Sequence, residues 1–197
     1  MAGDVVIVSG PPGAGKTSVA DALAAELDLG VHFESDWMYR FIKGGFVAPH
    51  LPASQAQNDV VMDTCVDAVA RYAHGGYTVF WDGVVGPWYL DRIVAALAQH
   101  SLEARYLVLR PSQTNALNRV RDRNGSDDVE SAETMYGKFL QLGCHEDNVI
   151  DTDAPLEAVL AACRTAMTQP GYLQTSCLLY TSPSPRDATL SRMPSSA

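Results

Sequence analysis

The chain has 197 residues, of which 47% are hydrophobic, and it carries a formal net charge of −9. This length and composition predict one globular domain. Because long nucleic acids bind to basic surfaces, the acidic balance argues against a polynucleotide substrate and favours a small one. No apolar run is long enough to span a bilayer and no N-terminal leader is evident, so we expect a cytoplasmic protein without a membrane segment.

The first apolar run leads directly into a glycine-rich loop. Residues 10–17 read Gly-Pro-Pro-Gly-Ala-Gly-Lys-Thr, which matches the pattern G-x-x-x-x-G-K-[ST] of a phosphate-binding loop, or P-loop. Glycines let backbone N–H groups surround phosphate oxygens, the lysine reaches the outer phosphates, and the threonine hydroxyl binds Mg²⁺. The strand pattern before the loop and the helical pattern over 16–27 favour this interpretation over a plain strand-turn-helix. We therefore expect a nucleoside triphosphate site formed by Gly10, Pro11, Pro12, Gly13, Ala14, Gly15, Lys16, Thr17 and Ser18.

Apolar, β-branched runs recur along the chain and alternate with helical patterns. They cover residues 4–9, 31–34, 78–81, 104–109 and 148–150. This alternation predicts a parallel sheet covered by helices. Together with the P-loop, it indicates an α/β protein with the three-layer fold of the P-loop nucleoside triphosphatases: a five-stranded parallel sheet, helices on both faces and a short lid.

Asp36 follows the second run, where a carboxylate can accept the proton of a substrate hydroxyl. A helix-capping or solvated role is also open, because Ser-Asp starts helices well. Residues 37–52 are rich in aromatic side chains without a strand pattern, and they predict a helical turn followed by a long loop that shapes a substrate pocket. Tyr39 and Arg40 are candidate substrate contacts there. The aromatic residues suit a core equally well, and Arg40 suits a surface ion pair.

Four more helices are expected after this loop. The first covers residues 54–73, where Ser54 and Gln57 have the spacing of a capping box. The second starts at Pro87, the third runs from 126 or 127 to about 142, and the last starts near Asp153 and ends before Pro170.

Asp82 ends the third apolar run and is followed by Gly83, a candidate substrate contact. Ligands of parallel α/β sheets bind outside the carboxyl ends of the strands, where both Asp36 and Asp82 are expected. A buried acid at such a strand end is costly unless it meets a cation or hydrogen-bond donors. We therefore expect Asp82 to hold Mg²⁺ or its water, with the division of roles between the two acids left open.

Arg119 and Arg123 are four residues apart and share one face of a predicted helix. Two guanidinium groups on one face can clamp the phosphates of a nucleotide and stabilise charge as a phosphoryl group moves. The alternative is a solvated helix face near Asp122, Asp127 and Asp128.

The spacing of Cys65, Cys144 and Cys163 fits neither a metal knuckle nor a C-x-x-C redox pair, so we expect core thiols. Cys144 and His145 could supply two ligands of a zinc site, but no second close pair accompanies them, so we do not expect zinc binding there.

The last residues differ in character from the rest. Residues 177–187 resemble the translation of a transposase sequencing adapter, and 191–197 resemble that of a flow-cell adapter. A natural Ser/Pro-rich tail is the alternative. Either tail is expected to be disordered, which leaves one P-loop domain over residues 1–176.

The chain resembles the P-loop small-molecule kinases of the shikimate-kinase-like, chloramphenicol-phosphotransferase-like and zeta-toxin-like group, whose members are often described as AAA-family ATPases. The resemblance covers about residues 4–168. It rests on the P-loop, Glu34-Ser35-Asp36, Trp81-Asp82-Gly83, Arg119-x-x-x-Arg123 and Val149-Ile150-Asp151-Thr152.

The resemblance implies that Asp36 binds the acceptor hydroxyl and that Arg119 and Arg123 belong to a lid that meets ATP. It also implies that the segment around Thr152 and Asp153 contacts adenine. The residues after the third run, Asp82-Gly83-Val84, lack the glycine-rich sugar-acid element of shikimate kinases, which argues against shikimate as the substrate.

These features predict a kinase that uses ATP and Mg²⁺ to phosphorylate a hydroxyl of a small molecule, with Lys16, Asp36, Asp82, Arg119 and Arg123 as its catalytic residues. The alternatives are an ATP-dependent switch that binds a protein partner and a toxin-like kinase of a nucleotide-sugar. The sequence is silent on oligomeric state.

Overall fold

The computed structural model describes residues 2–126 and 128–174. Asp127, one of the two expected helix starts, and the expected tail 177–197 lie outside the described residues. Within them the sheet has the order β2-β3-β1-β4-β5, and these five strands are parallel, as the sequence predicts. A short sixth strand, which the sequence analysis did not predict, runs antiparallel to β4. The strands are β1 (Val5–Ser9), β2 (Gly30–Glu34), β3 (Thr78–Asp82), β4 (Ala104–Leu109), β5 (Val149–Ile150) and β6 (Leu173–Gln174).

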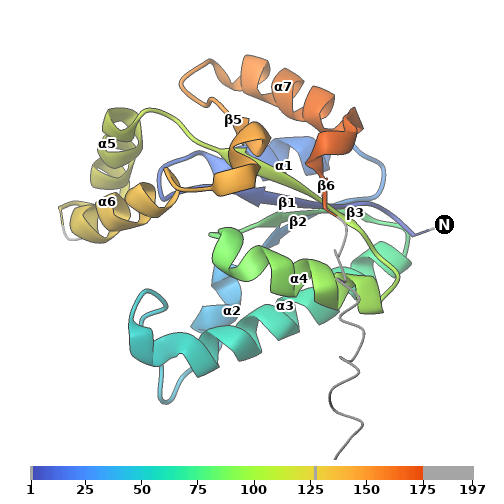
Figure 1. The fold of residues 1–197 in the computed structure, drawn as a ribbon, viewed down its shortest axis with the longest axis horizontal. Coiled ribbons are helices and arrows are strands. Elements are labelled where there is room, and N and C mark those ends of the chain that lie inside the picture. The colour runs from blue at the N-terminus through green and yellow to red at the C-terminus, as the bar shows by residue number, and fades with distance from the viewer. Residues whose placement is uncertain (1, 127, 175–197) are drawn as a thin grey trace, which may run out of the picture.

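Helices cover both faces of the sheet (Figure 1). On one face lie α1 (Lys16–Ala25) and α7 (Leu156–Thr168), and on the other lie α3 (Gln55–His74) and α4 (Pro87–Gln99). Beyond the carboxyl ends of the strands lie α5 (Gln113–Asn124) and α6 (Val129–Lys138). The short α2 (Asp36–Arg40) follows β2, and 3₁₀ turns cover Pro52–Ser54, Gly143–Asn148 and Pro170–Tyr172.

Alternation along the strands divides the hydrophobic core between the two faces. In β1, Val5 and Ile7 pack with α3 and α4, whereas Val6 and Val8 pack with α1 and α7. All four side chains are at most 1% exposed. A strand buried on both faces needs a continuous apolar run, which explains why β1 was so clearly marked in the sequence.

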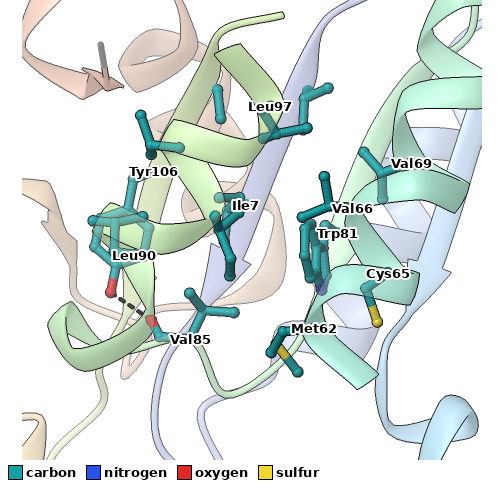
Figure 2. Close-up of a cluster of buried hydrophobic side chains, with 14 of the residues drawn as sticks. Ile7, Met62, Cys65, Val66, Val69, Trp81, Val85, Leu90, Leu97 and Tyr106 are labelled. Carbon is teal, nitrogen blue, oxygen red and sulfur yellow. Dashed lines mark hydrogen bonds between the residues drawn. The ribbon is translucent and has the colours of Figure 1, made fainter. Parts of the chain in front are cut away.

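A buried clamp fixes the segment that follows β3. The carbonyl oxygen of Val85 accepts a hydrogen bond from the Tyr106 hydroxyl of β4 at 2.6 Å, as Figure 2 shows. The same carbonyl accepts a second bond from Ser9 Oγ of β1, also at 2.6 Å, and Val85 N donates back to Ser9 Oγ at 3.0 Å. The segment leaving β3 is therefore attached to two other strands through side chains.

The expected capping box at the start of α3 is wrong. Ser54 Oγ donates to the carbonyl oxygens of Pro49 and Leu51 and does not cap the helix. The Gln57 side chain binds both backbone groups of Val47, accepting from its N–H at 2.9 Å and donating to its carbonyl at 2.7 Å. These side chains therefore fasten the preceding long loop onto α3.

The helix expected to reach residue 142 ends earlier, at Lys138 of α6. Cys65 and Cys163 are buried, as expected of core thiols, but Cys144 is exposed, so that part of the prediction is wrong. Cys144 stands at the start of a 3₁₀ turn that passes over the surface. No helix in the two described stretches combines the length and apolar character needed to cross a membrane.

Candidate active site

The P-loop connects β1 to α1 in a conformation that requires glycine. Gly13 has φ +80°, and a Cβ atom there would lie 2.2 Å from the carbonyl oxygen of Ala116. Gly15, with φ +90°, directly precedes α1 and leaves the helix N-terminus open. Backbone N–H groups at a helix N-terminus favour anions, so this geometry suits phosphate groups.

A cavity of about 320 Å³ opens over the loop and gathers the predicted residues from distant parts of the chain. The P-loop forms one wall, and the ends of β2 and β3 and helix α5 supply the others. The lining residues are Pro12, Gly13, Gly15, Lys16, Thr17, Ser18, Glu34, Asp36, Asp82, Val84, Arg119 and Arg123.

Lys16 is folded back over its own loop. Its Nζ donates to the carbonyl oxygens of Gly10 and Pro11, each at 3.1 Å. Desolvation by burial lowers the pKa of the Lys16 ammonium, and the carboxylates of Asp82 and Asp36 partly oppose that effect. A cation that is partly stripped of water and bound only to neutral carbonyls gains from phosphate oxygens as partners.

Asp82 is 3% exposed and ends β3, where it meets two side chains. The hydroxyl of Thr17 donates to Asp82 Oδ2 at 2.7 Å, and His32 Nε2 lies 3.4 Å from the same oxygen. The sequence analysis did not identify His32, because its place beside Asp82 depends on the pairing of β2 with β3. Mg²⁺ usually keeps several waters beside one or two hard protein oxygens, and the Thr17 hydroxyl and Asp82 carboxylate fit that donor set.

Asp36 stands at the first position of α2 and faces the cavity over the P-loop. The residue as a whole is exposed, but the protein atoms around its carboxyl partly desolvate it, and this raises its pKa. Lys16 lowers that pKa, while Asp82 and Glu34 raise it further. A carboxylate with a raised pKa is a better proton acceptor than an ordinary aspartate.

Arg119 braces the P-loop from α5. Its guanidinium donates to the carbonyl oxygens of Gly13 at 3.2 Å and Thr152 at 3.1 Å, and Thr152 Oγ1 donates to Ala14 O at 3.0 Å. Arg119 and Thr152 also line a second cavity, of about 270 Å³, beside the start of α1. Asp153 does not line it; its carboxylate instead accepts bonds from Ser112 N and Asn115 Nδ2 at the start of α5.

A third cavity, of about 310 Å³, adjoins the cavity over the P-loop. The two share Pro12, Asp36 and Val84, so they meet where these three residues lie. Tyr39, a predicted substrate contact, lines this third cavity. The sequence analysis missed three more of its lining residues, Asn58, Met62 and Met135, because their positions on apolar helix faces are typical of a core.

Two predicted substrate contacts line none of these three cavities. The Arg40 guanidinium stacks over the Trp37 ring, 4.2 Å from its centroid. Gly83 lies against Ser35, where a Cβ atom would be 2.3 Å from the serine hydroxyl oxygen. Two aromatic residues outside the 37–52 segment, Trp88 and Tyr89, line the third cavity. Trp37 and Phe46 line none of the three cavities. Trp37, Phe46 and Trp88 are each about half exposed.

The sequence and the fold of this chain were compared with those of known proteins. A family model described as AAA domain matches residues 5–138. A search of curated protein sequences found no match.

Solved structures with the same fold include three from bacteria. The tunicamycin resistance protein of Deinococcus radiodurans is 19% identical with a TM-score of 0.63, over 85% of this chain and 95% of that one. The APS kinase of Mycobacterium tuberculosis, in complex with AMPPNP and APS, is 14% identical with a TM-score of 0.61, over 85% and 99%. The shikimate kinase of Bacteroides thetaiotaomicron is 15% identical with a TM-score of 0.59, over 84% and 99%. The fold is therefore that of the P-loop small-molecule kinases.

Proposed function

This chain belongs to the AAA domain family, and from that premise we propose that it is a kinase that transfers the γ-phosphoryl group of ATP to a hydroxyl of a small molecule. The observation that carries the proposal is the pair of adjoining cavities that meet at Asp36. One is lined by the P-loop and two arginines, and the other is lined, apart from Pro12, by residues outside the loop. Such a pair can hold a phosphate donor and an acceptor side by side.

In the proposed complex, Lys16 and the backbone N–H groups of the P-loop bind the β- and γ-phosphates. Thr17 and Asp82 would hold Mg²⁺, which neutralises charge on the phosphate oxygens when it is bound. Arg119 and Arg123 line the same cavity and would stabilise the charge that spreads over the transferred group. Thr152 lines the cavity beside α1, which would take the adenine.

The proposed reaction is a single displacement. The acceptor oxygen forms a bond to the γ-phosphorus, and the bond between that phosphorus and the β,γ-bridging oxygen breaks, so ADP leaves. The proton of the acceptor hydroxyl passes to the Asp36 carboxylate. The raised pKa of Asp36 supports this role, because a base works best when its pKa lies close to the working pH.

The test compares Asp36→Asn with Asp91→Asn, a change of the same chemistry at an exposed site on α4. We expect Asp36→Asn to slow transfer to an acceptor by about 100-fold while ATP affinity changes by no more than about twofold. Asp91→Asn should change neither. An Asp36→Asn variant that keeps the full transfer rate contradicts the assigned base.

The same assay separates the kinase from a nucleotide-dependent switch. ADP release is measured with and without a metabolite extract, and phosphorylated products are identified by mass spectrometry. A kinase releases ADP faster when its acceptor is present. If turnover never responds to an acceptor while a protein partner co-purifies only with ATP, the switch is correct and the kinase is not.

A further inference from the structure

The third cavity, which adjoins the P-loop cavity at Asp36, has a distinctive chemical lining. One part is apolar and includes the side chains of Met62, Val84 and Met135. Its polar part includes the Asp36 carboxyl and the side-chain amide of Asn58. A ligand that fills this space therefore needs both an apolar face and polar groups that suit oxygen acceptors.

Among the described residues that line this cavity, none is a lysine or an arginine. Of the two cations that act on the Asp36 carboxylate, Lys16 is assigned to the nucleotide phosphates in the proposed complex, and Arg40 stacks over Trp37. Arg92 forms ion pairs with Asp59 and Asp63, at 3.3 and 2.8 Å. The Lys138 ammonium lies 5.5 Å from the centroid of the Trp88 ring and lines a neighbouring cavity. His50 lies exposed at the rim. An anionic ligand would thus be placed beside the Asp36 carboxylate without a matching cation in the lining, which is unfavourable.

Asn58, one of the lining residues, carries a buried acceptor that has no partner among the described residues. It is 7% exposed, and its Nδ2 donates to Pro49 O at 2.8 Å and Ser54 Oγ at 2.9 Å. These two bonds fix which end of the amide is the oxygen. Within the part of the chain that the structure describes, Asn58 Oδ1 is buried and accepts no hydrogen bond. A buried acceptor without a partner is unfavourable, and a ligand N–H or O–H group that reached it would remove that penalty.

Resting on the proposed kinase function, we infer that the acceptor is a hydroxylated compound without an anionic group. Its hydroxyl lies at Asp36, its apolar face packs against the methionines, and an N–H or O–H donor binds Asn58 Oδ1. Sugar phosphates, hydroxy acids and nucleotide-sugars do not fit this lining, since each carries an anionic group that needs a cation. The inference therefore argues against a toxin-like kinase of nucleotide-sugars.

The inference is tested with pairs of acceptors that differ in one group. N-Benzoylserine amide carries a hydroxyl, an aromatic face and N–H donors, and N-benzoylserine replaces the amide by a carboxylate. A library of such hydroxy amide and hydroxy acid pairs is screened for phosphorylated products by mass spectrometry. We expect kcat/KM for the amides to exceed that for the matched acids by at least about tenfold.

Two variants connect this preference to the lining. Ser131→Arg places a cation at an exposed lining position on α6, and it should raise the acid-to-amide ratio of kcat/KM by about tenfold. Ser131→Gln, a neutral change at the same site, should leave the ratio unchanged.

In the wild type, matched methyl esters should be poorer acceptors than amides, and Asn58→Leu should abolish that difference. Thermal unfolding confirms that each variant is folded.

Three results overturn the inference. One is a wild-type preference for the hydroxy acids. Another is an amide preference that Ser131→Arg leaves unchanged, and the third is an amide-to-ester difference that survives in folded Asn58→Leu. In each case phosphorylation still occurs, so the kinase function stands. If ATP binds in calorimetry but no acceptor of either class is phosphorylated, the kinase function itself fails and the inference fails with it.

Discussion

The Thr17 hydroxyl donates a 2.7 Å hydrogen bond to Asp82 Oδ2, which joins the first turn of α1 to the end of β3. In the proposed complex the Thr17 hydroxyl oxygen and the Asp82 carboxylate would both bind Mg²⁺. Their hydrogen bond already holds them close together without the metal. We predict that Thr17→Val, which keeps the shape and removes the hydroxyl, lowers Mg²⁺-dependent ATP turnover about 10- to 100-fold. The measurement is turnover as a function of Mg²⁺ concentration.

The control for this prediction is Thr64→Val. Thr64 is exposed on α3, where its hydroxyl donates to the Val60 carbonyl of its own helix at 2.8 Å. The control should keep wild-type turnover at every Mg²⁺ concentration. A Thr17→Val variant with the same Mg²⁺ dependence as this control would show that the hydroxyl takes no part in metal binding.

Asp36→Asn should make the protein more stable near neutral pH. Desolvation raises the Asp36 pKa in the folded protein above its unfolded value, so the ionised carboxylate destabilises the fold. The stability that the protonated carboxyl contributes is complete below the unfolded pKa and is lost as pH rises through the folded pKa. The gain in Tm from Asp36→Asn should thus be present at pH 7 and shrink towards acidic pH. Thermal unfolding from pH 3 to 8 gives the answer, and a Tm gain that grows on acidification contradicts it.

Arg119→Ala should weaken ATP binding by about tenfold, because the guanidinium fixes the carbonyl groups of Gly13 and Thr152 on either side of the loop. Calorimetry with a non-hydrolysable ATP analogue measures the change. Arg164→Ala is the matched control: Arg164 pairs with the Glu26 carboxylate on the surface, away from the site. Surface ion pairs contribute little, so this variant should bind nucleotide normally. Equal affinity losses in the two variants would refute the bracing role.

The two donors to Val85 O should show strong coupling in a double-mutant cycle. Tyr106→Phe removes one bond to this carbonyl, and we expect it to lower the free energy of unfolding by about 0.5–1.5 kcal/mol. Ser9→Ala removes the other bond together with the one that Val85 N donates to Ser9 Oγ, so its loss should be larger. Removing both leaves the buried carbonyl without either donor, so the double variant should lose more than the sum of the single ones. Urea unfolding measures all four proteins. Simple additivity would mean that water or another group replaces the donors.

Local patterns predicted much of this fold because they depend on neighbours in the chain. The apolar runs at β1 and β4 are buried on both faces, and their β-branched residues marked the strands to within a residue. The P-loop was equally legible, since the backbone at Gly13 and Gly15 dictates the residue type. By contrast β6 has only two residues, too few to show any alternation.

Relationships between distant segments were harder to predict. The sequence marked Asp82 as a site residue, but its contact with His32 depends on the pairing of β2 with β3, which no local pattern encodes. Met62 and Asn58 lie on the buried face of α3, and helical periodicity cannot distinguish a core position from the wall of a cavity. The Asp36 position, by contrast, follows from the end of a strand, which explains why that residue could be chosen in advance.

The attachments around β3 also bear on the thermodynamics of nucleotide binding. The Asp82 carbonyl accepts bonds from the backbone N–H and hydroxyl of Ser35, and three residues later Val85 is held by Ser9 and Tyr106. The backbone on both sides of the Asp82 carboxylate is thus immobilised by other strands and by α2's first turn. The conformational entropy of this segment is lost when the protein folds, so little of it remains to be lost when a nucleotide arrives.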